Sequence, residues 1–328
     1  MRNIVIFISL FGLIACTKKS DSLFIYTTFE EPLAQQLVTA YEKETGSKIE
    51  FVRLGTGEAA ARIDAEKSNP HSSLWLGGVG LGHEQLKQKG LSIPYSPKGT
   101  EKIESKFKDA EGYWTGIYIG VVAFASSKDR LQKLGVAAPQ SWADLLNPKF
   151  KKEIQLANPA SSGTSYTVLS SWIQSAGEEK AMDYFSKLNA NIAQYPKSGS
   201  APAKSVSVGE ATVAIGFAHD MIRLRDESKA PLQITFPSEG SGYEIASISL
   251  LKGAPQIEAA KKFYDWMYSK TASQILADYY VVPLIREGVQ LKADAFRPEE
   301  LKLIDVNVEW AGKSRDHILQ MWNDKIKG

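Results

Sequence analysis

The feature that most constrains the fold is an alternation of short strands and helices between residues 22 and 89. Three short apolar runs are typical of buried strands: 22–27 (SLFIYT), 48–54 (KIEFVRL) and 72–76 (SSLWL). Helical patterns follow them at 30–46, 58–67 and 83–89. A chain that alternates in this way forms a parallel sheet covered by helices on both faces. We therefore predict an α/β fold.

The chain of 328 residues is too long for one ordinary hydrophobic core, so we predict two lobes. The runs 113–126 and 243–251 are apolar and long enough to cross between them. The predicted division is residues 23–120 and 245–285 for lobe 1, 121–244 for lobe 2, and 286–328 as a helical C-terminal segment packing on a lobe. Two lobes joined by two crossover strands form a hinged clamp with a cleft.

The N-terminus has the pattern of an export signal. A basic start, Met1-Arg2-Asn3, precedes an apolar segment (4–15) that is too short to span a bilayer. The segment ends in Leu13-Ile14-Ala15-Cys16, which resembles a bacterial lipobox. We predict a signal peptide over 1–15, a lipid-modified Cys16 and a polar tether over 16–22. The alternative is a plain secretory signal with a chance cysteine.

Composition and motifs exclude several classes of function. A formal net charge of +2 without a Lys/Arg run gives no basis for nucleic-acid binding, and one cysteine excludes a disulfide framework. The sequence contains no HExxH, GxSxG, P-loop or CxxC motif. Residues 55–60 (GTGEAA) match a dinucleotide fingerprint, but Glu58 would face the pyrophosphate. We predict a binding protein with no enzymatic activity, cofactor or metal.

The stretch 152–175 predicts an anion site. A strand (153–157) is followed by a small polar loop and then by a helical pattern from Tyr166. The loop carries Ser161, Ser162, Gly163 and Thr164, and a helix start offers unpaired N–H groups and the positive end of the helix dipole. An ordinary capped helix start is the alternative.

A second loop, 196–200, offers further uncharged donors, including Ser198 and Gly199. Neutral N–H and O–H donors suit a phosphate or phosphonate group that the clamp removes from water. Lobe 1 is predicted to contain a parallel sheet, and ligands of parallel sheets bind beyond the carboxyl ends of the strands. The first-lobe residues predicted at these ends are Thr27, Thr28, Thr56 and Gly78.

Three polar residues follow strands of the second lobe. His219 and Asp220 come directly after the strand 212–217, and Glu239 follows the strand 232–236. Carboxylates with two acceptor oxygens suit sugar hydroxyls or an amine. The alternatives are a structural hydrogen-bonding role for His219, a helix N-cap for Asp220 and a solvated turn residue for Glu239.

Several segments together resemble a known family. They are LFIYTTFEEPLAQQLVTAYEKETG (23–46), GTGEAAARI (55–63), SLWLGG (73–78), SWADLLNPKFK (141–151), NPASSGT (158–164), GEATVAIGF (209–217), FPSEGSGYEI (236–245) and KKFYDWMYSKTASQIL (261–276). The chain resembles solute-binding proteins of bacterial ABC importers, of the ferric-iron-binding-like type. The resemblance implies a type II periplasmic-binding fold that delivers one ligand to an inner-membrane permease.

The resemblance also indicates the ligand. Iron-binding members carry an adjacent tyrosine pair at the position that follows the strand 212–217. This chain has Ala218-His219-Asp220 at that position. Its own adjacent pair, Tyr279-Tyr280, comes much later in the sequence and is typical of helix packing. His-Asp and the Ser-Gly-Thr loop resemble the hexose-phosphate branch, with a 2-aminoethylphosphonate branch close to it. We predict a monomeric, lipid-anchored receptor at the periplasmic face of a membrane. Its rivals are an aminoethylphosphonate receptor, a ferric-iron receptor and an enzyme acting on a phosphorylated metabolite.

Overall fold

The computed structural model describes residues 22–326. The predicted signal peptide, Cys16 and the tether up to residue 21 lie outside the described residues. Within the described part of the chain, no helix is long and apolar enough to cross a membrane.

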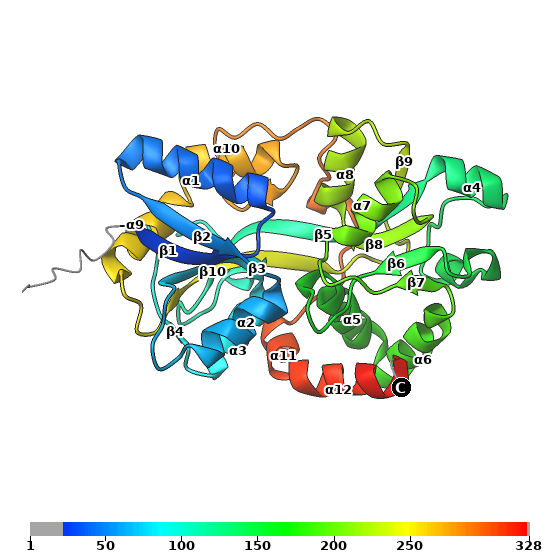
Figure 1. The fold of residues 1–328 in the computed structure, drawn as a ribbon, viewed down its shortest axis with the longest axis horizontal. Coiled ribbons are helices and arrows are strands. Elements are labelled where there is room, and N and C mark those ends of the chain that lie inside the picture. The colour runs from blue at the N-terminus through cyan, green and yellow to red at the C-terminus, as the bar shows by residue number, and fades with distance from the viewer. Residues whose placement is uncertain (1–21, 327–328) are drawn as a thin grey trace, which may run out of the picture.

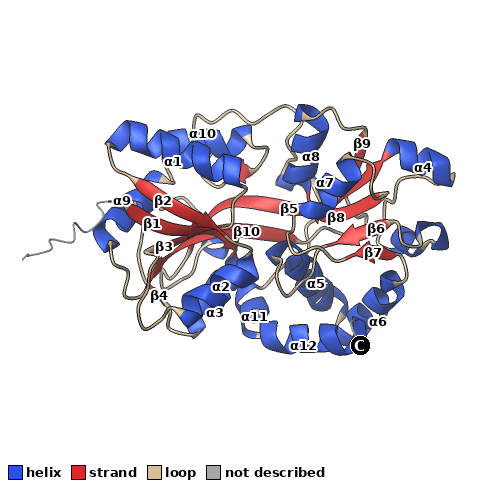
Figure 2. Ribbon diagram, in the orientation of Figure 1, coloured by secondary structure: helices blue, strands red, loops and turns tan. Residues whose placement is uncertain are grey.

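The strands of residues 22–326 form one twisted sheet that runs through both lobes, in the order β2-β1-β3-β10-β5-β8-β6-β7, with β4, β9 and β11 attached at its sides (Figure 2). The strands are β1 (Leu23–Thr27), β2 (Ile49–Arg53), β3 (Leu74–Val79), β4 (Ser92–Ile93), β5 (Thr115–Ser127), β6 (Ile154–Leu156), β7 (Ile192–Gln194), β8 (Val213–Phe217), β9 (Leu232–Thr235), β10 (Tyr243–Leu251) and β11 (Val282–Pro283).

Helices cover both faces of this sheet (Figure 1). The helices are α1 (Glu31–Thr45), α2 (Thr56–Ala65), α3 (Gly80–Gln88), α4 (Lys128–Leu134), α5 (Gly163–Ala176), α6 (Glu178–Asn189), α7 (Ala201–Ser207), α8 (Ala218–Glu227), α9 (Ile257–Trp266), α10 (Lys270–Asp278), α11 (Val308–Lys313) and α12 (Arg315–Ile326). In Figure 1, α1, α10, α8 and α7 lie on one side, and α2, α3, α5, α11, α12 and α6 on the other.

The first lobe is built on β1 to β4. β1 pairs in parallel with β2 and β3, and β10 runs antiparallel to β3. Pro32 lies in the first turn of α1, where its missing N–H costs nothing, and Gly46 ends the helix with φ 72°. The predicted α/β fold is confirmed.

The second lobe is built on β6 to β9. β8 pairs in parallel with β6 and antiparallel with β5. One half of β5 pairs with β10 of the first lobe, up to Val121, and the other half pairs with β8 and β9 from Val122 onward. β5 therefore carries the chain from one lobe to the other, and β10 carries it back.

Two predicted elements differ in their bounds. The third strand, expected over 72–76, is β3 over Leu74–Val79 and continues through Gly77 and Gly78. Both have positive φ angles, and a Cβ on Gly77 would lie 2.5 Å from the ring of Phe29, so only glycine fits there. The C-terminal segment 286–328, expected to be helical, forms α-helix only from Val308 onward, after an irregular segment.

The C-terminal helices contact both lobes rather than one. α11 packs closely on α3 of the first lobe, since a Cβ on Gly312 would lie 2.9 Å from Cβ of Glu84. α12 continues onto α6 of the second lobe, where the rings of Phe185 and Trp322 meet edge to face at 5.8 Å. This segment therefore bridges the lobes on one side of the sheet (Figure 1).

Candidate functional site

A cavity of about 720 Å³, part of it open to solvent, lies between the two lobes. The first lobe contributes the carboxyl ends of its parallel strands, and the second contributes the N-terminal ends of α5, α7 and α8. The predicted site residues that line it are Thr28, Thr56, Gly78, Ser161, Ser162, Gly163, Thr164, Ser198, Gly199, His219 and Asp220.

The start of α5 forms one corner of the cavity. Ser162 is the N-cap, and its Oγ accepts a hydrogen bond from the N–H of Ser165 at 3.3 Å. The N–H groups of Gly163 and Thr164 lie in the first turn of α5 and have no helical carbonyl four residues earlier to donate to, so they stay available for a ligand. This corner, residues 160–164, has the donors and the helix-dipole field that an anion requires.

The loop before α5 is fixed from within. Asn158 accepts three N–H groups: Oδ1 accepts from Ala160 at 3.0 Å, and the carbonyl accepts from Ser161 at 3.2 Å and Ser162 at 2.9 Å. Because these donors are already used, the backbone groups left for an anion are those of the first turn of α5.

The second predicted loop meets this corner directly. A Cβ on Gly199 would lie 2.2 Å from Oγ1 of Thr164 and 2.9 Å from Oγ of Ser162, so only glycine allows this approach. Oγ of Ser161 donates to the carbonyl of Lys197 at 2.9 Å. The structure therefore brings Ser161, Ser162, Gly163, Thr164, Ser198 and Gly199 to one place.

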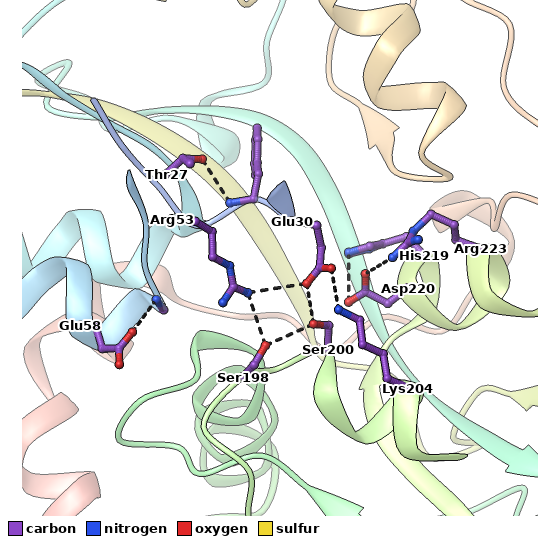
Figure 3. Close-up of polar contacts among 12 residues, drawn as sticks. Thr27, Glu30, Arg53, Glu58, Ser198, Ser200, Lys204, His219, Asp220 and Arg223 are labelled. Atoms are coloured by element: carbon purple, nitrogen blue, oxygen red, sulfur yellow. Dashed lines mark hydrogen bonds and ion pairs between the residues drawn. The ribbon is translucent and has the colours of Figure 1, made fainter. Parts of the chain in front are cut away.

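A charged cluster from both lobes borders the same corner (Figure 3). The carboxylate of Glu30, in the first lobe, accepts from Ser200 Oγ at 2.6 Å and from Lys204 Nζ at 2.8 Å, both in the second lobe. Arg53, the last residue of β2, lies 3.6 Å from Glu30 and 3.4 Å from Oγ of Ser198. Burial alone would raise the pKa of Glu30, but the bonds from Lys204 and Ser200 hold it below its usual value.

Four polar side chains lie at the other end of the cavity: Tyr118, His219, Asp220 and Glu244. His219 Nε2 lies 4.0 Å from Asp220, and Nδ1 of His219 has no hydrogen-bond partner among residues 22–326. Glu244 sits opposite Gly120 in the β10–β5 pairing, and a Cβ on Gly120 would lie 2.6 Å from Oε1 of Glu244. The missing side chain of Gly120 makes room for this carboxylate.

Burial shifts the pKa of each of these groups toward its neutral form. It raises the pKa of Glu244 from 4.5 to about 8, an effect that the charge of Asp220 adds to and a hydrogen bond with Tyr118 opposes. The pKa of Asp220 is also raised and that of His219 lowered, in both cases mainly by burial. This end of the cavity therefore presents donors as well as acceptors, which suits a neutral polyhydroxy group.

Two predicted site residues do not line the cavity. Thr27 is fully buried, and its Oγ1 accepts from the N–H of Phe29 at 3.2 Å (Figure 3). Glu239 lies elsewhere in the second lobe, where Oε1 accepts the N–H of Trp142 at 3.0 Å. Tyr279, expected in helix packing, does border the cavity.

The sequence interpretation missed Glu30, Arg53, Tyr118 and Glu244, and it covered Lys197 and Ser200 only as members of the loop 196–200. A signal existed for Arg53, a charged residue at the carboxyl end of a predicted strand. Glu58, by contrast, caps its own helix, because its Oε2 accepts from the N–H of Gly55 at 3.0 Å (Figure 3). Its carboxylate therefore occupies the helix start where a nucleotide would place its pyrophosphate, as the sequence indicated.

A family model described as "Bacterial extracellular solute-binding protein" matches residues 82–307. The structure of the periplasmic binding protein AfuA from Actinobacillus pleuropneumoniae, with exogenous fructose 6-phosphate bound, is 37% identical with a TM-score of 0.90. The match covers 94% of this chain and 99% of that one. The chain belongs to the bacterial extracellular solute-binding protein family.

Curated relatives agree with this assignment. An uncharacterized protein of Haemophilus influenzae is 35% identical and is matched over 93% of this chain and 90% of its own. A Sinorhizobium fredii protein named as an ABC transporter periplasmic-binding protein is 26% identical, with 87% and 80% covered. A Salmonella typhi periplasmic protein named for 2-aminoethylphosphonate binding is 28% identical, with 71% and 68% covered. This solute-binding protein is a receptor and not an enzyme.

The raised pKa of Glu244 predicts how the stability of this receptor depends on pH. Between 4.5 and about 8 the unfolded state ionises Glu244 and the folded state does not, so stability falls as pH rises. One such proton changes the free energy of unfolding by up to about 1.4 kcal/mol per pH unit. Glu244→Gln cannot ionise, so we expect the variant to gain stability relative to the wild type from pH 5 to pH 8. Urea unfolding at several pH values measures this difference, and a difference independent of pH would contradict the assignment.

Proposed function

We propose that this protein is the solute receptor of an ABC importer and captures a small phosphorylated organic solute, most specifically a hexose phosphate. The observation that carries the proposal is the two-ended cavity. Two donor loops meet at the start of α5, and His219, Asp220 and Glu244 lie at the other end. The likeness to a structure with fructose 6-phosphate bound and to an ABC transporter binding protein supports it.

The chemistry of the two ends assigns the two parts of the solute. Neutral N–H and O–H donors with a helix N-terminus suit the phosphoryl group, and Arg53 and Lys197 add positive charge at the same corner. At the other end, a neutral acid and a neutral imidazole suit hydroxyl groups. An amine would pair best with ionised carboxylates, and the raised pKa of Glu244 disfavours its ionised form, which supports a sugar over an aminoalkyl tail.

We also propose that the receptor is monomeric, that it is exported and held to the membrane by lipid at Cys16, and that it delivers its solute to an inner-membrane permease. The lipobox-like sequence before Cys16 supports the anchor. Metabolic labelling with a fatty acid tests it: Cys16→Ser should lose the label and leave the membrane fraction.

Thermal unfolding with candidate ligands tests the proposed solute. A ligand at one hundred times its Kd stabilises the folded protein by about 2.7 kcal/mol. We expect glucose 6-phosphate or fructose 6-phosphate to raise the Tm by several degrees, while glucose does not. A rise in Tm with 2-aminoethylphosphonate alone would assign that solute, and iron-dependent visible absorbance without any effect of phosphorylated compounds would assign ferric iron.

A further inference from the structure

We infer that Arg315, the first residue of α12, is a positioning residue that holds the anion-binding corner in its solute-binding geometry. This inference rests on the proposed function of that corner. Arg315 does not line the cavity. It contacts the loop that precedes α5 and so holds the cavity-lining residues of that loop in place.

Among the described residues, the hydrogen bond and the ring contact of Arg315 are made to this loop and to α5. Its Nη2 donates to the carbonyl of Ala160 at 2.9 Å, directly before Ser161 and Ser162. Its guanidinium carbon lies 4.6 Å from the ring centre of Tyr166 in α5. The hydroxyl of Tyr166 in turn donates to the carbonyl of Ala311 in α11 at 2.7 Å. The junction of the two C-terminal helices is therefore tied to the first two turns of α5.

Arg315 is also an unusual residue to bury. Only 6% of it is exposed, its Nη1 has no hydrogen-bond partner among residues 22–326, and burial lowers its pKa. A buried charge of this kind is costly unless an opposite charge offsets it. Among the described residues the guanidinium forms no ion pair with a carboxylate, so a bound anion at the adjacent corner would supply the compensating charge.

The position of Arg315 connects this role to the motion of the lobes. α11 packs on α3 of the first lobe and α12 on α6 of the second, and Arg315 stands at their junction. The first lobe contacts the same loop, since the N–H of Gly57 donates to the carbonyl of Ser161 at 3.3 Å. The contact with Gly57 breaks when the lobes separate, whereas Arg315 belongs to the helix that lies on the second lobe. Arg315 therefore keeps the corner formed in the open receptor.

Arg315→Met tests this inference, because methionine keeps an apolar stem and removes the charge and the donors. In the ligand-free protein, we expect backbone amides of residues 160–166 to exchange hydrogen at least tenfold faster. We expect the Kd for glucose 6-phosphate to rise at least tenfold. Arg315→Lys should recover most of the slow exchange and most of the affinity, because an ammonium group can still donate to Ala160. If the methionine variant fails to fold, the lysine variant is compared with the wild type in the same two measurements.

Arg130→Met is the matched control. Arg130 also braces the second lobe, donating to the carbonyl of Gly209 and to Glu153, but it lies outside the cavity lining. This variant should leave the exchange of residues 160–166 and the Kd within twofold of the wild type. Unchanged exchange in Arg315→Met, or equal effects of Arg315→Met and Arg130→Met, would overturn the inference. If the wild-type protein binds no phosphorylated compound, the proposed function is refuted. The hydrogen-exchange measurement needs no ligand, so it tests the role of Arg315 separately from the proposed function.

Discussion

Gly57→Ala is expected to weaken binding of glucose 6-phosphate by roughly thirtyfold, or about 2 kcal/mol, without destabilising the free protein. A Cβ at this position would lie 2.3 Å from the carbonyl oxygen of Ala160 and 3.2 Å from Cα of Ser161. Gly57 belongs to α2 of the first lobe, and Ala160 belongs to the second. The added methyl group therefore opposes closure of the cleft.

The open protein has no reason to lose stability from this change. Gly57 is helical, and alanine is favoured over glycine in helices by about 0.5–1 kcal/mol. Stability and affinity should therefore change in opposite directions, which distinguishes a block to closure from a general packing defect. Calorimetric titration measures the affinity, and thermal unfolding without ligand measures the stability.

Gly163→Ala provides a graded comparison. Its new Cβ would lie 2.6 Å from Oγ1 of Thr56, again across the lobes, but this oxygen belongs to a side chain that can rotate. We expect a smaller loss of affinity than for Gly57→Ala. Wild-type affinity in Gly57→Ala would show that the bound receptor does not close as this structure does.

Asp220→Ala is expected to weaken binding of the same solute by about 2 kcal/mol or more. Asp220 borders the cavity at the end opposite the α5 corner. It lies in the first turn of α8, and among residues 22–326 no other helix start places a carboxylate at that end. Its loss removes charge-assisted hydrogen bonds to the solute. In the free protein the substitution removes the ion pair with Arg223 at 3.9 Å, and it also removes a buried charge that raises the pKa of Glu244. These two effects on stability oppose each other.

Two measurements make the Asp220 prediction specific. Asp220→Asn keeps the shape and one acceptor oxygen, so it should bind more tightly than Asp220→Ala. Inorganic phosphate, which lacks a sugar, should bind all three proteins with similar affinity. An unchanged affinity of Asp220→Ala for glucose 6-phosphate would remove Asp220 from the binding site.

The parts of the site that could be predicted are those built from contiguous sequence. The strand, the loop 158–162 and the helix α5 follow one another, so the pattern of residue types was enough to place the loop with Ser162 next to a helix start. The helix begins at Gly163, three residues before the expected Tyr166. His219 and Asp220 directly follow a strand, and strand ends meet at one edge of a parallel sheet.

The parts that could not be predicted depend on contacts between distant segments. Glu244 reaches the cavity because the β10–β5 register sets it opposite Gly120, a pairing that sequence patterns do not reveal. Glu239 has the same local signal as Asp220, a carboxylate after a strand, yet its partner is the N–H of Trp142. Arg315 is more than 150 positions from the loop it contacts, and no local pattern indicates that partnership.

A crystal structure of the receptor grown with glucose 6-phosphate tests the central claim most directly. We predict a closed cleft with the phosphoryl oxygens within hydrogen-bond distance of the N–H groups of Gly163 and Thr164, and with the sugar against Asp220 and Glu244. A phosphoryl group bound elsewhere, or an empty corner at the start of α5, would contradict it.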